Sequence, residues 1–431
     1  MRVSGPLVFG VGLLCALARI PAPLSAQRGG MFLGSADDPA IAYSTAPLNN
    51  AVTGINKKLQ DGTVQLTFQG RSGYLQSALS ALDIPVDSQM LVFSQTSFQA
   101  RRISEANPRA LFFNDRAVLG WVRDGEIIEV AAQDAKEGVV FYTLDQRPTD
   151  RPEFRRTYTC LACHMVGDTL GVPGLLMFST TTSPDSGGFA KSVTTDHRSP
   201  LAERWGGWYV TGSSGSAEHR GNEAATLRGR PIRELASVDG LFDGDGYRSM
   251  SSDIAALLVL SHQTHMTNLL TRVGWEARAA DPALHAPFVA APGEESRIAQ
   301  MMSGIATEVV DYLLFVDEAP LAGRVQGSSG FAQRFAAAGP RDAKGRSLRE
   351  LDLTRRLMRY PCSYLIYSDA FDALPPSAKD PIYRRMLEVL SGEDGGARYR
   401  SALSLSDRQA IVEILRDTKK DLPAYFQEVG R

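Results

Sequence analysis

The sequence predicts an α+β protein, on three observations along its 431 residues. Short runs that are apolar throughout, or alternate apolar and polar residues, follow one another between 63 and 143, as β-strands do. From about 251 onward, apolar residues recur at the spacing of amphipathic helices. Gly, Ser, Thr and Pro are frequent in the stretch between them. We therefore expect a β-rich N-terminal third, a central region with little regular structure and an α-helical C-terminal part.

The first 26 residues have the pattern of an export signal. Arg2 is followed by an apolar run at 7–17 and by the small residues Ser25 and Ala26, as in a cleavable leader. The run is too short, and too interrupted by Gly and Pro, to predict a stable membrane span. No later segment has the length and apolarity of a transmembrane helix. We expect cleavage after Ala26 and a mature protein that is periplasmic or otherwise exported.

The overall composition is that of an ordinary globular protein, with 43% hydrophobic and 22% charged residues. A formal net charge of −2 gives no reason to expect nucleic-acid binding. The sequence contains no phosphate-binding glycine loop, no nucleophile elbow and no convincing metalloprotease motif. These function classes therefore have no support.

The N-terminal region, 27–150, is predicted to combine two helices with a series of strands. We expect the helices at 51–60 and 74–82. We expect the strands at 63–68, 90–93, 110–113, 118–122, 127–130 and 139–143. Asp124-Gly125 favours a tight hairpin turn between two of these strands.

The central region, 151–250, contains the motif Cys160-Leu161-Ala162-Cys163-His164. Two cysteines separated by two residues, with histidine directly after the second, are the attachment signature of a c-type haem. The thiols can add to the two vinyl groups of the porphyrin, and the adjacent imidazole can bind iron from the proximal side. We therefore predict one covalent haem c, held by Cys160 and Cys163, with His164 as the proximal iron ligand.

Two other interpretations of this motif stay open. In a thiol–disulfide oxidoreductase Cys160 would attack and Cys163 would resolve, which requires a strand-to-helix context and a lowered thiol pKa. A structural zinc site requires four ligands, whereas the motif supplies three. Cys362, the other cysteine of the mature chain, is predicted to be a small buried hydrophobic residue.

The C-terminal region, 251–431, is predicted to be helical and to pack on the haem. We expect helices at 253–273, 294–316, 348–359, 382–390 and 406–418. The first of them has Ser252 as its expected N-cap and Gly274 as its expected end.

The distal side of the iron decides between two kinds of function. A second protein ligand favours electron transfer, whereas an open position lets iron bind substrates or gases. His262 lies in the middle of an apolar face of helix 253–273 and is our first candidate for the distal ligand. Met266, about 40° away around the helix, is the second. His219 and His197 follow, and an iron without a distal protein ligand is an equal alternative to His262.

Residues Arg198, Arg204, Trp205, Trp208 and Tyr209 also have two interpretations. Their guanidinium groups could bind haem propionates while their rings cover the macrocycle. Alternatively, they form an aromatic cluster between strands, with the arginines at the surface. The run 205–212 is itself predicted to be a strand with a glycine kink.

The motif at 160–164 resembles that of c-type cytochromes, in which both thiols bind the haem and the adjacent histidine is the proximal ligand. The longer run 204–212 is similar to that of uncharacterised exported bacterial proteins described as cytochrome c-like. The chain is several times longer than small electron-carrier cytochromes. The resemblance implies one-electron transfer with unidentified redox donor and acceptor proteins. The alternative is a peroxidase-like haem oxidoreductase with an open distal site.

Overall fold

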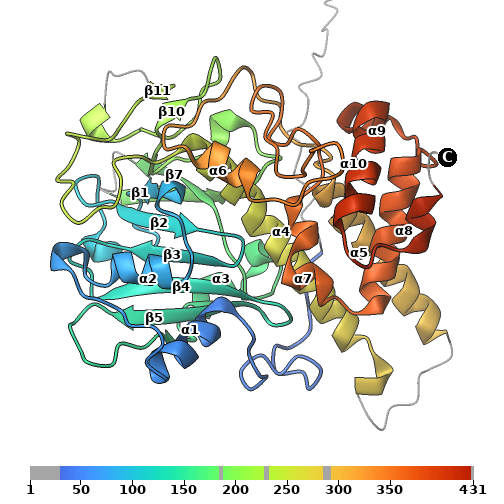
Figure 1. The fold of residues 1–431 in the computed structure, drawn as a ribbon, viewed down its shortest axis with the longest axis horizontal. Coiled ribbons are helices and arrows are strands. Elements are labelled where there is room, and N and C mark those ends of the chain that lie inside the picture. Colours follow the sequence, from blue (N-terminus) through green and yellow to red (C-terminus); the bar gives the residue numbers. More distant parts are fainter. Residues whose placement is uncertain (1–29, 184–187, 228–232, 285–292, 429–431) are drawn as a thin grey trace, which may run out of the picture. The chain divides into compact units, whose positions relative to one another are not determined.

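The computed structural model of the protein describes residues 30–183, 188–227, 233–284 and 293–428. The predicted leader, 1–26, lies outside these ranges. From Met31 onward the chain forms one compact unit, in which a mainly N-terminal antiparallel sheet is followed by helices (Figure 1). The predicted α+β class is confirmed. None of the helices in the described ranges is long and apolar enough to cross a membrane.

The main sheet has seven strands in the order β6-β5-β4-β3-β2-β1-β9, and neighbouring strands are antiparallel. Its strands are β1 (Met90–Val92), β2 (Arg109–Phe113), β3 (Ala117–Trp121), β4 (Ile127–Asp134), β5 (Gly138–Asp145), β6 (Arg155–Arg156) and β9 (Trp208–Tyr209). β1 to β5 confirm five of the predicted strands. The predicted turn at Asp124-Gly125 joins β3 to β4, and Asp124 adopts the left-handed conformation with φ of 57°.

The predicted strand at 63–68 is wrong. The backbone N–H of Thr67 donates to the Ser77 hydroxyl, which in turn donates to the Thr67 carbonyl, at 3.0 Å each. Ser77 belongs to helix α2 (Leu75–Ala81). A side chain therefore satisfies backbone groups that a neighbouring strand would otherwise pair with.

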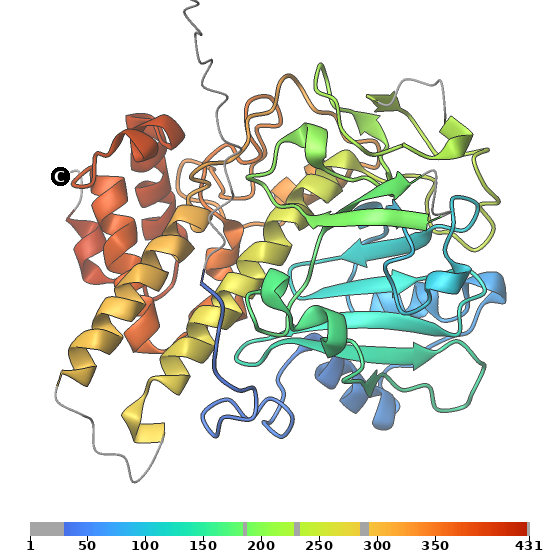
Figure 2. The same cartoon turned by 180° about the vertical axis from the view of Figure 1, so that it is seen from behind.

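The two faces of the sheet are covered to different extents. Along β4, residues pointing to one face are buried, and those pointing to the other are only partly buried. The buried face shares a core cluster with apolar residues of α1 (Ala51–Gln60) and α2. On the other face, Leu111 and Phe113 share a core cluster with α4 (Ile254–Ala279). Figure 2 shows α4 on the same side of the sheet as the short helix α3 (Leu161–His164).

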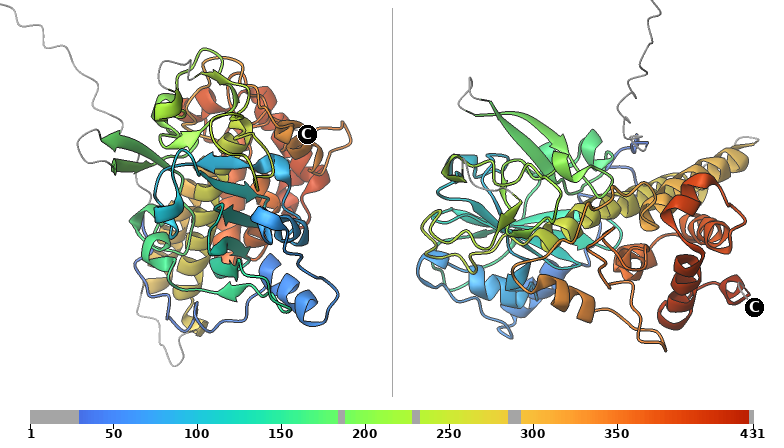
Figure 3. Two further views of the ribbon diagram at one scale, coloured as in Figure 1. Left: turned by 90° about the vertical axis from the view of Figure 1, so that its left-hand side faces the viewer. Right: turned by 90° about the horizontal axis from the view of Figure 1, so that it is seen from above.

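Part of this second face forms what we call the open strip: Arg109, Val118, Glu129 and Ala131. Strand register places these residues on one face, and each is only partly buried. A hairpin of β7 (Phe178–Ser183) and β8 (Gly188–Thr194) projects from the molecule on this side (Figure 3). β7 lies in the central region, 151–250, which was predicted to have little regular structure, so that prediction is wrong for these residues.

The rest of the chain is mainly helical. A two-stranded ribbon, β10 (Gly212–Ser213) with β11 (Glu234–Leu235), precedes α4. The later helices are α5 (Glu294–Leu313), α6 (Phe331–Ala337), α7 (Asp369–Asp372), α8 (Pro376–Ser391), α9 (Ala397–Ala402) and α10 (Leu405–Thr418). α4 is capped by Asp253, whose carboxylate accepts from the N–H groups of Ala255 and Ala256. It therefore starts one residue later than predicted, and it continues beyond Gly274.

The helix predicted at 348–359 does not form. The Asp352 carboxylate accepts hydrogen bonds from the backbone N–H groups of Thr354 and Arg355, both at 2.9 Å. Leu353 has a positive φ of 55°. A turn in which a side chain binds the following backbone N–H groups competes with helix formation. The chain reverses direction here, and Leu351 forms an antiparallel β-bridge with Met358.

Candidate functional site

The cysteine–histidine motif folds into one helical turn. The N–H of Cys163 donates to the carbonyl of Cys160 at 3.1 Å, and the N–H of His164 donates to the same carbonyl at 2.9 Å. Residues three and four apart on such a turn are neighbours, so Cys160, Cys163 and His164 come together. Cys163 is exposed, Cys160 is partly buried and neither forms a disulfide. Leu161 and Met165 anchor the turn by packing on the protein core.

The His164 imidazole has one nitrogen bound and the other free. Its Nδ1 lies 2.9 Å from the carbonyl oxygen of Gly174. Because a carbonyl oxygen can only accept, Nδ1 carries the proton and Nε2 keeps its lone pair. No described residue forms a hydrogen bond with Nε2. Burial lowers the pKa of His164, which favours the neutral, metal-binding form.

The His164 ring lies over the sheet. It packs against the Phe141 ring with 4.9 Å between centroids and 48° between planes. Phe141 pairs with Ala131 of the open strip, so both side chains point to this face. The motif therefore sits at the border of the open strip, where the His164 ring covers Phe141.

An ion pair between two partly buried side chains crosses the open strip beside the motif. Arg109 pairs with Glu129, which also accepts from the Ser97 hydroxyl at 3.2 Å. A Cβ at Gly120 would lie 2.5 Å from an Arg109 guanidinium nitrogen, so glycine allows this guanidinium to lie flat across β3. Burial, and secondarily the negative charge of Glu129, raises the pKa of the Cys160 thiol. A raised thiol pKa is the opposite of what the disulfide-exchange interpretation requires.

These features fit a covalently attached haem. The turn offers two thiols and an imidazole nitrogen with a free lone pair, and Arg109 is a donor of the kind that pairs with propionates. Large apolar side chains are exposed around the motif, among them Tyr158 just before it and Phe98, which follows the Glu129 partner Ser97. An apolar macrocycle can cover surface of this kind.

His262, our first candidate for the distal ligand, has both ring nitrogens within hydrogen-bond distance of other side chains. Its side chain is fully buried. Its Nδ1 lies 2.7 Å from Nδ1 of His197, and its Nε2 lies 2.7 Å from the Ser363 hydroxyl. Both ring nitrogens are therefore occupied, and burial lowers the pKa of His262 to about 3. The structure gives no support to His262 as the distal ligand, because an iron ligand needs a free nitrogen.

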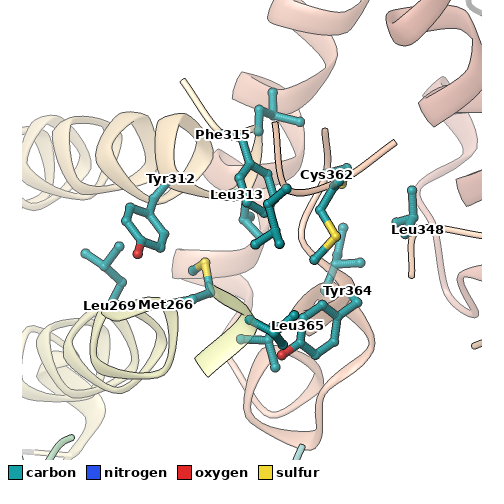
Figure 4. Packing of buried hydrophobic residues seen from close by; sticks show 14 of the residues in the cluster. Met266, Leu269, Tyr312, Leu313, Phe315, Leu348, Cys362, Tyr364 and Leu365 are labelled. Carbon is teal, nitrogen blue, oxygen red and sulfur yellow. The ribbon is translucent and has the colours of Figure 1, made fainter. Parts of the chain in front are cut away.

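Met266 points into the apolar core between the helices. It is fully buried, and Figure 4 shows its sulfur among Leu269, Tyr312 and Leu365. The same picture places Cys362 in this core, where burial raises the pKa of its thiol to about 12. The predicted role of Cys362 as a buried hydrophobic residue is confirmed, and the structure gives no support to Met266 as a distal ligand.

The other two histidine candidates, His197 and His219, are buried and pack against aromatic rings. His197 stacks on Tyr312 with 4.1 Å between ring centroids. His219 is buried beside Trp205, and burial lowers its pKa to about 4. His285 lies outside the described ranges.

Most of the arginine and aromatic residues at 198–209 pack inside the protein, whereas Arg198 is partly exposed and pairs with Asp196. Arg204 is buried and donates to the carbonyls of Ser199 and His197, at 2.8 Å each. Trp208 donates from its indole N–H to the carbonyl of Phe178 at 2.8 Å. The packing interpretation is thus confirmed for these side chains, but the prediction that the arginines lie at the surface is wrong for Arg204.

Two residues that the sequence reasoning missed are connected to His164. Gly174 binds its ring, and Asn268 of α4 binds the segment that contains Gly174. In the sequence, Asn268 is an amide within an otherwise apolar stretch of a predicted helix. Such an amide is expected to be buried and therefore to require hydrogen-bond partners. Nothing in the sequence indicated which partners these are.

Among the described residues, no three His, Cys, Asp or Glu side chains come together as ligands of a bare metal ion, as a zinc site would require. Comparison of the chain with protein-family models, with curated proteins and with solved structures gave no match.

Proposed function

We propose that this protein is an exported monohaem c-type cytochrome that transfers single electrons between protein partners. The observation that carries the proposal is the geometry of His164 on one helical turn with two unpaired cysteines. Its Nδ1 is bound to a backbone carbonyl, and none of the described residues forms a hydrogen bond with its Nε2. Metal-binding histidines usually have their second nitrogen fixed in this way.

Each residue of the site has a separate task in this proposal. Cys160 and Cys163 hold the haem through thioethers, and His164 provides the proximal nitrogen. When bound, the haem supplies a one-electron couple between ferric and ferrous iron. Arg109 already pairs with Glu129, so it would offer a propionate only the N–H donors that this pair leaves free.

Export and partners follow from two further features. The leader-like residues 1–26 support delivery to the periplasm or another compartment outside the cytoplasm. The exposed Phe98 and Tyr158 offer apolar surface near the motif. Surface of this kind is suited to transient contact with a redox donor or acceptor protein.

The second candidate function is a peroxidase-like haem oxidoreductase with an open distal position. One observation favours it over a carrier with two protein ligands. The side chains first considered as distal ligands, His262 and Met266, are committed to the core of the helical part.

The optical spectrum of the purified protein, before and after addition of cyanide or peroxide, tests these functions. A six-coordinate low-spin spectrum that does not respond to either addition supports the carrier and excludes the oxidoreductase. A high-spin spectrum that shifts on addition supports the oxidoreductase. A Cys160→Ser/Cys163→Ser variant is the control, because its spectrum should contain no haem that survives denaturation.

A further inference from the structure

We propose that Asn268 of α4 is a positioning residue for the His164 ligand. It acts through a segment that we call the strap, Pro173–Leu175. This inference rests on the proposed function, since it concerns the strength of His164 as an iron ligand. It connects the site to a distant part of the sequence, because Asn268 and Leu175 are 93 positions apart in the chain.

Asn268 binds the strap at two points. Its Nδ2 donates to the carbonyl of Leu175 at 2.8 Å, and its Oδ1 accepts from the N–H of Leu175 at 3.0 Å. The amide thus pairs with both backbone groups of one residue, as a neighbouring strand would. Asn268 is 1% exposed, so losing either bond would leave a buried polar group unsatisfied.

The strap binds His164 at two further points. The N–H of Gly174 donates to the carbonyl of His164 at 2.9 Å, and the carbonyl of Gly174 accepts from Nδ1 of its ring at 2.9 Å. On its other side the carbonyl of Pro173 accepts from the N–H of Val139 in β5 at 3.2 Å. The strap is therefore fixed between the sheet and α4, and His164 is fixed to the strap.

Close packing makes this arrangement specific. A Cβ at Gly174 would lie 2.3 Å from Oδ1 of Asn268, far inside normal contact distance. The strap can approach α4 closely enough to be bound by Asn268 only because residue 174 has no side chain.

The side of α4 on which Asn268 lies explains its role. It is six positions after His262 and two after Met266, which places it about 120° and about 160° away from them around the helix. The helix thus presents His262 and Met266 to the helical core, and Asn268 to the segment that holds the iron ligand. α4 therefore contributes to the site through Asn268, on the His164 side of the iron, and not through His262 or Met266.

The inferred consequence concerns the electron-donating strength of His164. A hydrogen bond from Nδ1 to a fixed carbonyl raises the basicity of the imidazole and stabilises ferric over ferrous iron. Releasing the strap weakens this bond, so the reduction potential should rise. Removal of such outer partners typically changes metal binding 10- to 100-fold. A tenfold change in the ferric-to-ferrous preference corresponds to about 59 mV for a one-electron couple.

The test compares Asn268→Ala with Gln263→Ala in the haem-loaded protein. Gln263 is the matched control, because it is a buried amide of the same helix that binds another loop, donating to the carbonyl of Asn114 at 2.8 Å. Asn268→Ala should raise the reduction potential by about 59 mV or more, and Gln263→Ala should leave it unchanged. Equal shifts in the two variants would overturn the inference.

A double-mutant cycle with Gly174→Ala provides an independent measure, which also covers the case that Asn268→Ala folds poorly. Gly174→Ala alone should displace the strap and raise the potential in the same direction. With Asn268→Ala in the same chain, the added methyl has room, so the combined shift should be smaller than the sum of the two. Additive shifts would contradict direct coupling.

A readout at the ring separates this inference from the proposed function. In haem-free protein the ¹⁵N chemical shifts of His164 report its tautomer, whereas iron bound at Nε2 would keep the proton on Nδ1 in every variant. Loss of the Nδ1–H form in haem-free Asn268→Ala, but not in haem-free Gln263→Ala, supports the positioning role. An unchanged tautomer in both variants overturns it, whereas absence of covalent haem from the wild-type protein refutes the proposed function.

Discussion

His164 and His262 occupy opposite kinds of environment in one protein. His164 binds a backbone carbonyl with one nitrogen and keeps the other free, on a turn beside the open strip. His262 uses both nitrogens, to His197 and Ser363, and stacks near Tyr312 and Phe315 in a closed core. The comparison teaches that helical periodicity identifies which histidines are buried, whereas their hydrogen bonds decide which of them can bind a metal.

The largest expected difference between the two histidines is seen by replacing each with alanine. His262→Ala leaves the Ser363 hydroxyl and a His197 nitrogen without their partner and should lower the free energy of unfolding by roughly 2–4 kcal/mol. It should not alter the iron spectrum. His164→Ala should change the iron spectrum and cost less stability. Urea unfolding and optical spectra of the two variants provide the measurements.

A shift from low-spin to high-spin iron in His262→Ala would contradict this assignment. It would mean that the ring leaves its hydrogen bonds to bind iron. His265→Ala, on the same helix, is a suitable control for a general disturbance of α4.

The second expected effect is a loss of stability in acid. Burial lowers the pKa of His262 from 6.5 to about 3 and that of His265 to about 4. Between about pH 6.5 and 4 the unfolded chain therefore binds protons that the folded protein does not, so the free energy of unfolding should decrease as the pH falls through this window. Glu318 acts in the opposite direction, since burial raises its pKa to about 7.

Thermal or urea unfolding from pH 7.5 to 4.5 measures this dependence. The slope should be clearly smaller in His262→Gln than in the wild-type protein, because one of the responsible groups is then absent. Identical slopes in the two proteins would show that His262 does not contribute to the acid sensitivity.

The smallest expected effect concerns the open strip. Gly120→Ala places a methyl against the Arg109 guanidinium and should break its pair with Glu129, lowering stability by about 1 kcal/mol. Gly54→Ala in α1 is the matched control, because nothing lies within 4 Å of a Cβ at Gly54. It should raise stability by about 0.5–1 kcal/mol through helix propensity. A Gly120→Ala variant that is as stable as the wild-type protein would show that Gly120 is not required for the flat position of Arg109.

Much of the fold could be predicted because its signals are local. Apolar runs identified β1 to β5, and helical spacing identified α1, α4, α5, α8 and α10. The errors at 63–68 and 348–359 have a shared cause. In each, a polar side chain, Ser77 or Asp352, binds backbone groups that a strand or helix would have used. Hydropathy patterns do not contain that information.

The site could be predicted only in its local part. Cys160, Cys163 and His164 are adjacent in sequence, and the observed helical turn brings them together. The ring partner Gly174 and the distant Asn268 depend on how the strap lies between β5 and α4, which no spacing rule predicts. The candidate distal ligands failed to gain support for the same reason, since the side of α4 that faces the motif is set by tertiary packing.

The most direct test of the central claim is the intact mass of the denatured protein. The full chain, 1–431, is expressed in a host that matures c-type cytochromes and is compared with Cys160→Ser/Cys163→Ser. We predict that the wild-type chain is heavier than its processed sequence by the mass of one haem, and that the double variant has the unmodified mass. An unmodified wild-type chain, or haem retained by the denatured double variant, would contradict the account.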